Sequence, residues 1–317
     1  MRFAFILDPL DSLNAHKDSS IAMMRAAQDA GHAVWTIQQP AIHWSALHGV
    51  CAEAVHLELL EDDAQWFVEI DRHVVPLRDF AVVVMRKDPP FNMEYVTATW
   101  LLTCAESEGA RIFNRPQALR DHSEKLSVME FPQFSVPTLV ARDAGLIQAF
   151  IDRQGDAILK PLDGMGGSQI FRVRHDDPNR NVIVETVLHE GARTIMAQRY
   201  IPEIADGDKR ILIVGGEVVP YCLARIPKAG ETRGNLAAGG IGVARELTAR
   251  DREIAQTLAP VLAARGLLLV GIDVIGDWLT EINVTSPTCM VEICDQSGFD
   301  AAVMFIVALE RQCALQR

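Results

Sequence analysis

Polar side chains recur at regular spacing in two apolar runs near the end of the chain. Asp273 lies in the first run, and Glu281 and Asn283 lie in the second, after a Gly-Asp turn. Side chains alternate between the two faces of a strand, so these three share one face if the turn preserves the register. Carboxylate and amide oxygens suit Mg²⁺. A solvated sheet face is the alternative, but unpaired carboxylates among Val and Ile side chains are costly, which favours a metal site.

A second segment combines a lysine with closely spaced glycines. Lys160 ends an apolar run and is followed by Gly164, Gly166, Gly167 and Ser168. Glycine permits positive φ and lets backbone N–H groups approach a phosphate closely, while the lysine adds positive charge. The spacing matches neither the Walker pattern nor the dinucleotide-binding fingerprint. A plain hairpin turn explains the same residues equally well, so this segment alone leaves both interpretations open.

Basic residues in motif-like surroundings form a third group. Arg86 ends a predicted strand, which is where α/β sheets usually bind ligands. The planar guanidinium group suits carboxylates and phosphates, whereas lysine acts as a point charge. Any one of these residues alone is typical of a solvated surface, but together with the glycine segment and the metal site they predict a site for anions. The set comprises Arg86, Lys87, Lys125, Lys209, Arg210, Arg225 and Arg233.

The elements that position these residues alternate between strands and helices in the first third of the chain. A helix begins at Asp18-Ser19 and ends at Gly31, and this β-α-β order predicts a mostly parallel sheet covered by helices. The strands of this part are predicted at 3–7, 33–37, 80–86 and 111–114, with a second helix at 92–108.

The middle of the chain predicts a small α+β lobe, and the last third predicts two hairpins separated by a helix. Thr248 and Asp251 form a capping-box-like start for that helix, which ends before Gly266. In the lobe the expected helices are 121–131 and 143–153, and the strands are 157–161, 169–174 and 194–201. The hairpins are 210–214 with 217–224 and 267–275 with 278–284, and a final helix follows Phe299.

A glycine-rich segment, 227–242, lies between the first hairpin and the helix. It is too long and too rich in small residues to be an ordinary connection. Its glycine content and its lack of apolar periodicity predict a mobile lid that carries Arg233 and closes over substrates, excluding water.

Composition narrows the class of protein. The chain has 317 residues, which is enough for two or three packed subdomains. Its formal charge of -12 argues against binding to nucleic acid or to an anionic membrane. No segment has the length of a membrane span, and the first residues lack the features of a signal peptide. The six scattered cysteines show no metal spacing. These features predict a cytoplasmic protein with free thiols.

The order of these features resembles the ATP-grasp superfamily, with a lysine before the small lobe, a second lysine and a glycine segment within it, and a D-x₇-E-x-N hairpin. The match to the bacterial glutathione synthetase family is closer and covers nearly the whole chain. It is carried by the strings Met85-Arg-Lys-Asp-Pro-Pro-Phe91, Lys160-Pro-Leu-Asp-Gly-Met-Gly-Gly167, Asp206-Gly-Asp-Lys-Arg210, Gly230-Glu-Thr-Arg-Gly-Asn-Leu-Ala-Ala-Gly-Gly240 and Thr280-Glu-Ile-Asn-Val-Thr-Ser-Pro-Thr-Cys289.

The resemblance implies an ATP-dependent ligase that joins γ-glutamylcysteine to glycine through an acyl-phosphate and releases ADP and phosphate. It implies ATP and Mg²⁺ as cofactors, with Mn²⁺ as an alternative metal, and a homo-oligomer. The fold implied is an α/β ATP-grasp fold with an N-terminal parallel-sheet substrate domain over residues 1–121. A small α+β ATP lid would follow over 122–201, and a C-terminal α+β domain with the metal site over 202–317.

The resemblance also implies a role for each candidate residue. The ATP phosphates would contact Lys125, Lys160, Gly164, Gly166 and Gly167, the adenine would contact Gln198, Arg199, Tyr200 and Ile201, and the ribose would contact Asp208. Mg²⁺ would be held by Asp273, Glu281 and Asn283. The transferring phosphoryl group and the substrate carboxylates would be stabilised by Arg210, Arg225 and Arg233. Further substrate contacts would come from Asp18, Arg86, Asn235 and Ser286.

Two positions depart from the family pattern, and two rival functions remain open. Ile241 and Val291 stand where a basic residue is expected, which affects contacts of the loop and of the glycine end. A D-Ala-D-Ala or glutamate-adding ligase would use the same fold. A nucleotide-binding regulator without turnover would also retain it, but the two lysines, the metal-site residues and the arginines speak against a protein without catalysis.

Overall fold

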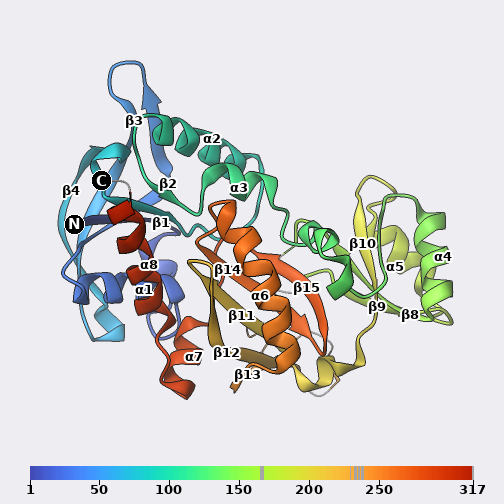
Figure 1. Ribbon diagram of the computed structural model, residues 1–317. Helices are drawn as coiled ribbons and strands as arrows, with labels where there is room; N and C mark the ends of the chain where they lie inside the picture. The colour runs from blue at the N-terminus through green and yellow to red at the C-terminus, as the bar shows by residue number, and fades with distance from the viewer. Residues whose placement is uncertain (165–167, 229, 232–233, 235, 237–238, 316–317) are drawn as a thin grey trace.

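The chain folds into three sheets that follow one another along the sequence (Figure 1). The computed structural model describes residues 1–164, 168–228, 230–231, 234, 236 and 239–315. The first and third sheets lie together in a large body, and the second forms a smaller lobe at its side.

The first sheet has six strands in the order β4-β3-β2-β1-β5-β6. Strands β1, β2, β5 and β6 pair in parallel, as predicted, whereas β2, β3 and β4 are antiparallel. The antiparallel extension is absent from the prediction, because most β4 side chains are exposed and therefore show no buried face in the sequence. The strands are β1 (Arg2–Leu7), β2 (Ala33–Ser45), β3 (Gly49–Leu59), β4 (Phe67–Pro76), β5 (Val82–Met85) and β6 (Ile112–Phe113).

Helices cover this sheet, and the first of them begins at its predicted cap. Asp18 accepts hydrogen bonds from the N–H groups of Ser20 and Ile21 at the start of α1 (Ser19–Asp29), which satisfies donors that a helix start leaves free. Asn92 caps α2 (Met93–Ser107) in the same way. A short helix, α3 (Pro116–Asp121), leads toward the lobe.

The lobe is an antiparallel sheet in the order β7-β10-β8-β9 with its own buried cluster. The predicted helix at 143–153 is confirmed as α4 (Ala144–Gln154), which Asp143 caps. Helix α5 (Arg180–Val187) was not predicted. The strands are β7 (Thr138–Ala141), β8 (Asp156–Pro161), β9 (Phe171–Arg174) and β10 (Ile195–Arg199).

The predicted helix at 121–131 is wrong. The chain leaves α3 at Asp121 and forms only a 3₁₀ helix, η4 (Leu126–Glu130). The reason lies at residue 124, whose carbonyl accepts a hydrogen bond from the N–H of Ile282 in the third sheet. A backbone carbonyl that accepts a hydrogen bond from a strand is not free to accept the bond that an α-helix requires.

The third sheet has the order β13-β12-β11-β14-β15, and both predicted hairpins are confirmed. The predicted capping box at Thr248 and Asp251 is also confirmed. The strands are β11 (Asp208–Val214), β12 (Glu217–Ile226), β13 (Ile241–Glu246), β14 (Leu269–Ile275) and β15 (Trp278–Asn283), and the helices are α6 (Ala249–Ala264), α7 (Met290–Ser297) and α8 (Ala301–Leu315).

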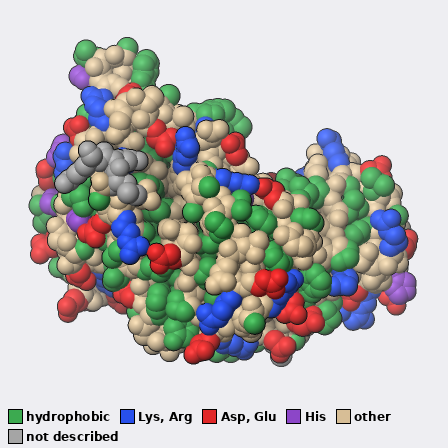
Figure 2. Space-filling model, viewed as in Figure 1, with side chains coloured by type: hydrophobic (Ala, Val, Ile, Leu, Met, Phe, Trp, Pro, Cys, Tyr) green, Lys and Arg blue, Asp and Glu red, His purple; other side chains and the backbone are tan. Residues whose placement is uncertain are grey.

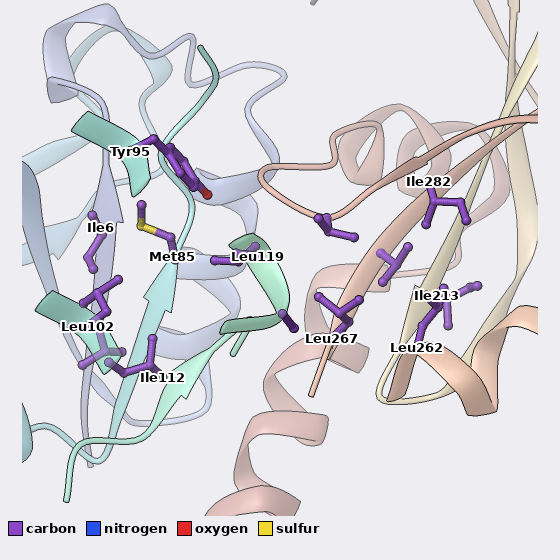
Figure 3. Close-up of a cluster of buried hydrophobic side chains, with 14 of the residues drawn as sticks. Ile6, Met85, Tyr95, Leu102, Ile112, Leu119, Ile213, Leu262, Leu267 and Ile282 are labelled. Atoms are coloured by element: carbon purple, nitrogen blue, oxygen red, sulfur yellow. The ribbon is translucent and has the colours of Figure 1, made fainter. Parts of the chain in front are cut away.

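A shared core joins the first and third sheets. Buried side chains such as Ile6, Met85 and Leu102 on one side and Ile213 and Ile282 on the other belong to one cluster (Figure 3). The two sheets therefore pack together as one body.

The face of the molecule shown in Figure 2 carries basic and acidic side chains interspersed. No helix in the described part of the chain is long and apolar enough to cross a membrane.

Candidate active site

A cavity of about 280 Å³ is lined by residues from the three parts of the chain that contain the three sheets. The first part of the chain supplies Asp88 and Pro89, and the connection to the lobe and the lobe itself supply Glu124, Lys125 and Gly164. From the third sheet and the segment that follows it come Arg210, Arg225, Leu236, Asp273, Glu281, Asn283, Thr285, Ser286, Pro287, Thr288 and Cys289. The lining mixes apolar and polar groups and carries charges of both signs.

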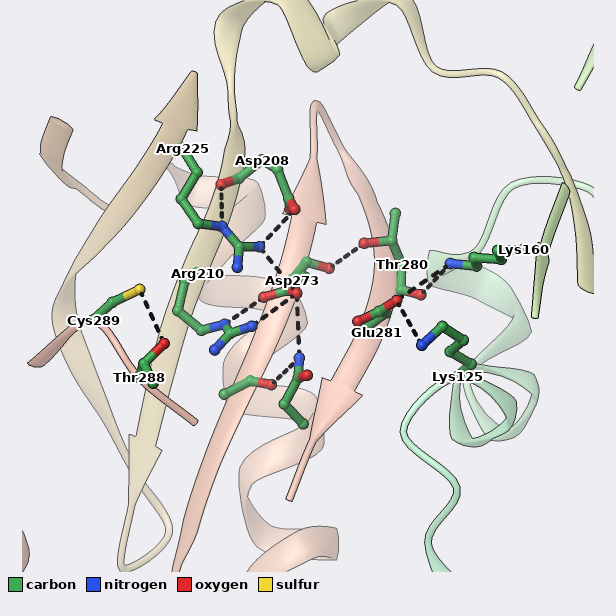
Figure 4. A network of polar contacts seen from close by, with 12 residues as sticks. Lys125, Lys160, Asp208, Arg210, Arg225, Asp273, Thr280, Glu281, Thr288 and Cys289 are labelled. Carbon is green, nitrogen blue, oxygen red and sulfur yellow. Dashed lines mark hydrogen bonds and ion pairs between the residues drawn. The ribbon is translucent and has the colours of Figure 1, made fainter. Parts of the chain in front are cut away.

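Strand register brings the charged residues of the third sheet together (Figure 4). Arg210 on β11 is the direct cross-strand partner of Asp273 on β14, and Asp273 is in turn the partner of Glu281 on β15. Asp208 on β11 faces Arg225 on β12. Side chains of direct partners lie on one face within reach of each other. Asp273, Glu281 and Asn283 converge as predicted, but the register is not preserved from the turn: Val274 pairs with Leu279, and a β-bulge then shifts the pairing so that Asp273 faces Glu281.

Asp273 lies at the centre of an ion-pair network. Arg210 donates through Nε and Nη2 to its two carboxylate oxygens at 2.5 and 3.0 Å. Arg225 Nη2 lies 3.0 Å from Asp273 Oδ2 and 2.6 Å from Asp208 Oδ2, so it bridges two carboxylates. Gly271 makes room for this arrangement, since a Cβ there would lie 2.8 Å from Arg210 Cδ.

The two carboxylates of this network differ in electrostatics. Burial alone would raise the pKa of Asp273, but the charges of Arg210 and Arg225 outweigh it and hold that pKa well below its usual range. Burial raises the pKa of Asp208 to about 6, and Arg225 opposes this only in part. Among the described residues, Asp208 Oδ1 has no hydrogen-bond partner. Asp208 is therefore a half-buried acid whose buried Oδ1 can still accept a hydrogen bond.

Two lysines converge on Glu281. Lys125 Nζ lies 3.5 Å and Lys160 Nζ 3.8 Å from Glu281 Oε1, although the lysines come from different segments. Lys125 also donates to the carbonyl of Gly164 at 2.6 Å, and Lys160 donates to the carbonyl of Thr280 at 3.3 Å. Burial lowers the pKa of Lys160 and the charge of Lys125 adds to this effect, while Glu281 opposes it. Lys125 lines the cavity, whereas Lys160 reaches the same carboxylate without lining it.

The donor set on β14 and β15 fits a hard divalent cation. Asp273 and Glu281 supply carboxylates, and Asn283, whose Nδ2 donates to Asp273 Oδ2 at 3.2 Å, supplies an amide oxygen. Oxygen donors in this number suit Mg²⁺ bound together with phosphate. Within the described ranges, no three His, Cys, Asp or Glu side chains are grouped as a metal site by themselves. A cation here therefore depends on the amide and on ligands from phosphate.

The segment 198–201 contains the end of β10, a strand of the sheet of the lobe. Gln198 is buried, and its Nε2 donates to Thr138 Oγ1 at 3.0 Å. The Tyr200 ring packs against the guanidinium of Arg172, 3.6 Å from its centroid, and the Arg199 guanidinium lies over Trp278. Ile201 is buried. Gln198, Arg199 and Tyr200 thus each contact a different side chain elsewhere in the chain, and whether the backbone of this segment meets a nucleotide base stays a prediction.

Arg86 and Ser286 lie on the side of the first sheet. Arg86 is 4% exposed, its Nε donates to Ser20 Oγ at 3.0 Å, and its Nη1 has no partner among the described residues. Burial lowers the pKa of Arg86. Ser286 donates through Oγ to the Asp88 carboxylate. Asp18, predicted as a substrate contact, caps α1, and its carboxylate oxygen Oδ1 accepts both capping bonds.

Four predicted site residues lie outside the described residues, namely Gly166, Gly167, Arg233 and Asn235, and so do further parts of the predicted lid. Other residues that line the cavity were not predicted from the sequence. Asp88, Glu124 and Thr285 line the cavity but were not singled out. Asp88 and Thr285 were within quoted motifs, whereas Glu124 precedes Lys125 and carried no signal beyond that position.

All six cysteines are free, as predicted. Cys289 lines the cavity, and burial raises the pKa of its thiol although Arg210 and Arg225 oppose the rise. A thiol with a raised pKa is a weak nucleophile at neutral pH, because the thiolate is the reactive form. The chemistry of the cavity thus rests on its charged groups.

Comparisons with known proteins cover nearly the whole chain. The model of the prokaryotic glutathione synthetase N-terminal domain matches residues 1–120, and that of the prokaryotic glutathione synthetase ATP-grasp domain matches residues 124–298. The chain is 57% identical to a glutathione synthetase of Ralstonia nicotianae, over 98% of this chain and 96% of that protein. It is 56% identical to a glutathione synthetase of Nitrosomonas europaea, over 99% of both.

Solved structures share the fold at low sequence identity. The D-cycloserine synthetase DcsG superposes with a TM-score of 0.69 at 15% identity, covering 99% of this chain and all (100%) of that one. A RimK domain ATP-grasp protein from Sphaerobacter thermophilus superposes with a TM-score of 0.61 at 17% identity, covering 98% and 100%. These likenesses show the ATP-grasp fold.

Proposed function

The chain belongs to the prokaryotic glutathione synthetase family, and from this membership we propose that its cavity joins γ-glutamylcysteine to glycine. As a member of that family it is an ATP-dependent ligase of glutathione biosynthesis. The observation that carries the choice of site is the meeting of Arg210, Arg225 and Lys125 in one cavity with acidic residues, one of which, Glu281, also pairs with Lys160.

The proposed reaction has two steps. In the first, a carboxylate oxygen of γ-glutamylcysteine attacks the γ-phosphorus of ATP, and the bond from that phosphorus to the bridging oxygen breaks as ADP leaves. In the second, the amine of glycine attacks the acyl carbon, the bond to the phosphate oxygen breaks, and the amine proton leaves with solvent or phosphate. Neither step needs a protein nucleophile, so alignment and charge stabilisation are the work of the protein.

The cationic side chains supply that stabilisation in the proposal. Lys125 and Lys160 would exchange Glu281 for phosphate oxygens, and Gly164 with Gly166 and Gly167 would contact the same phosphates. Arg210, Arg225 and Arg233 would stabilise the transferring group and the carboxylates. Mg²⁺, or Mn²⁺ in its place, would be held by Asp273, Glu281 and Asn283 and would neutralise phosphate charge.

We propose a division into a substrate domain over 1–121, an ATP lid over 122–201 and a metal-bearing domain over 202–317, and the remaining ligand contacts are assigned within it. Adenine would contact the segment Gln198, Arg199, Tyr200 and Ile201, and the ribose would contact Asp208, whose free buried oxygen supports this role. The dipeptide and glycine would contact Asp18, Arg86, Asn235 and Ser286. The unpartnered Nη1 of buried Arg86 supports a carboxylate ligand there. Free thiols in all six cysteines support a cytoplasmic location.

A coupled assay tests the proposed substrates. ADP release should require γ-glutamylcysteine and glycine together, with Mg²⁺ present, because the acyl-phosphate is turned over only when an amine accepts it. The measurement compares each substrate alone with both, and with D-alanine as a competing amino acid. Equal activity with D-alanine alone would show a different ligase, and ATP binding without ADP release under every condition would show a non-catalytic nucleotide-binding protein.

We also propose that the protein is a homo-oligomer, with β4 as a self-association surface. This strand lies at the outer edge of the first sheet and carries the exposed apolar side chains Val68, Ile70 and Val74. An exposed edge strand with apolar side chains is a ready surface for pairing with another chain.

The proposed surface predicts a change of mass on substitution. Ile70 is 52% exposed. The substitution Ile70→Lys should lower the molecular mass measured by light scattering after size exclusion, because it would bury a charge in the interface. Val182→Lys on α5, which is also exposed, serves as the control. A wild-type mass of one chain would contradict the oligomer, and an unchanged mass for Ile70→Lys would contradict this surface.

A further inference from the structure

Glu124 makes more contacts with the third sheet than a surface acid would. Its Oε1 accepts hydrogen bonds from the N–H of Val284 at 2.9 Å, the N–H of Thr285 at 3.1 Å and Thr285 Oγ1 at 2.9 Å. Its backbone carbonyl accepts from the N–H of Ile282 at 2.9 Å. The residue therefore holds the end of β15 and the segment after it from both its backbone and its side chain.

The next residue is the lysine that contacts Glu281. Because Glu124 fixes the backbone beside β15, the adjacent Lys125 enters the cavity from a fixed position, and its Nζ lies 3.5 Å from Glu281 Oε1. Lys125 comes from the connection to the lobe, whereas Glu281 and Asn283 come from the third sheet. The distance between the lysine and these residues thus depends on the contacts of Glu124.

The segment after β15 has a second anchor that does not involve Glu124. Ser286 Oγ donates to the carboxylate of Asp88, and the N–H of Asp88 donates to Asp8 Oδ2 at 3.0 Å. Thr285 and Ser286 are both buried. Loss of the Glu124 side chain removes three of the four bonds and leaves the one from Ile282 to the Glu124 carbonyl, so it should loosen the position of Lys125, while Asp88 keeps the segment itself attached to the first sheet.

We propose that Glu124 is a positioning residue that acts through Lys125, setting its place relative to Glu281 and Asn283 and thereby the affinity for the triphosphate of ATP. The inference rests on the proposed function for the role of Lys125. Glu124 is not assigned to substrate contact or to proton transfer. A carboxylate that accepts three hydrogen bonds is a strong local anchor, because bonds to an ionised acceptor are stronger than neutral ones.

The test measures binding of a non-hydrolysable ATP analogue with Mg²⁺ by calorimetry, together with KM for ATP and kcat. Glu124→Ala should weaken analogue binding by about tenfold and raise KM for ATP by a similar factor, with a smaller change in kcat. Glu124→Gln keeps an acceptor oxygen and should restore most of the affinity. Glu130→Ala removes an acidic side chain from η4 that pairs with Arg265, and it should bind the analogue like the wild type.

A double-mutant cycle with Lys125→Ala separates positioning from a general loss of structure. If Glu124 acts through Lys125, Glu124→Ala should add little to the effect of Lys125→Ala. Additive effects, wild-type affinity in Glu124→Ala, or equal losses in Glu124→Ala and Glu130→Ala would each overturn the inference. Should Glu124→Ala fail to fold, Thr285→Val removes one of the three donors, and its smaller loss should likewise vanish in the Lys125→Ala background; persistence of that loss would overturn the inference.

The analogue experiment does not depend on the amino-acid substrates. If neither the wild type nor any variant forms ADP with γ-glutamylcysteine and glycine, the proposed substrates are wrong. Analogue binding would still decide whether Glu124 is coupled to Lys125.

Discussion

Glu281→Gln is expected to lower turnover by about 10²-fold or more while the fold is retained. The substitution keeps the shape of the side chain and removes its charge. Glu281 Oε1 lies within 3.8 Å of both Lys125 Nζ and Lys160 Nζ, and the backbone of Glu281 pairs with that of Asp273. The variant therefore loses a metal ligand and leaves two buried ammonium groups without their shared carboxylate. Steady-state kinetics over a range of Mg²⁺ concentrations measures the effect.

The Mg²⁺ dependence distinguishes the two consequences. A weaker metal site should raise the Mg²⁺ concentration needed for half-maximal turnover, and circular dichroism should show retained secondary structure. Glu253→Gln on α6, which removes a surface acid paired with Arg250, is the matched control and should behave like the wild type. Unchanged turnover of Glu281→Gln at limiting Mg²⁺ would count against the metal site.

The metal hairpin illustrates what a sequence predicts well. Its two apolar runs are joined by a tight turn, and the sequence was enough to predict both strands and the gathering of Asp273 and Glu281. The exact pairing of these two residues requires a β-bulge between Asp273 and Val274, which the period-2 alternation does not show. The Thr248 cap and the Asp18 cap were predictable for a similar reason, because each is a local interaction between residues three or fewer apart. Interactions between residues close in the chain can be predicted from the residue types at those positions.

Glu124 illustrates what a sequence does not reveal. Its partners are about 160 residues away in the chain, at Val284 and Thr285, and one of its bonds replaces a bond that a helix would have made. The local pattern around residue 124 therefore predicted a helix that tertiary contacts prevent. Strand β4 was missed for another reason, since its side chains are exposed on both faces and the sequence shows no buried period.

The same distinction applies to the charged network. The sequence indicated that basic and acidic residues would gather, but it assigned Asp273 to a metal and Asp208 to a ribose, without indicating that Arg225 bridges the two. That bridge arises because β12, β11 and β14 are neighbours in the sheet, in an order that is not the order of the chain. Strand order is a property of the fold, and short-range patterns carry little information about it.

Replacing Arg225 by Met is expected to lower the free energy of unfolding by about 3–5 kcal/mol and turnover by about 10²-fold. Arg225 is 6% exposed and is the cation between Asp208 and Asp273. Met occupies a similar volume without charge, so the buried carboxylate of Asp273 and the half-buried carboxylate of Asp208 would be left close together, with only Arg210 beside Asp273. Removing one partner of a buried pair is costly because the remaining charge has lost its solvent and its counter-ion. Urea unfolding and steady-state kinetics measure the two effects.

The pH dependence of this variant identifies the charge responsible. Burial already raises the pKa of Asp208 to about 6, and loss of Arg225 should raise it further. The folded variant then binds this proton at a higher pH than the unfolded chain does, so its unfolding free energy should rise as the pH falls from about 8 to about 6, narrowing the gap to the wild type. Arg245→Met on β13 removes an exposed guanidinium that donates to the carbonyl of Asp206 and serves as the control. A deficit for Arg225→Met that is constant across this pH range would show that lost packing, and not the unpaired charge of Asp208, accounts for the instability.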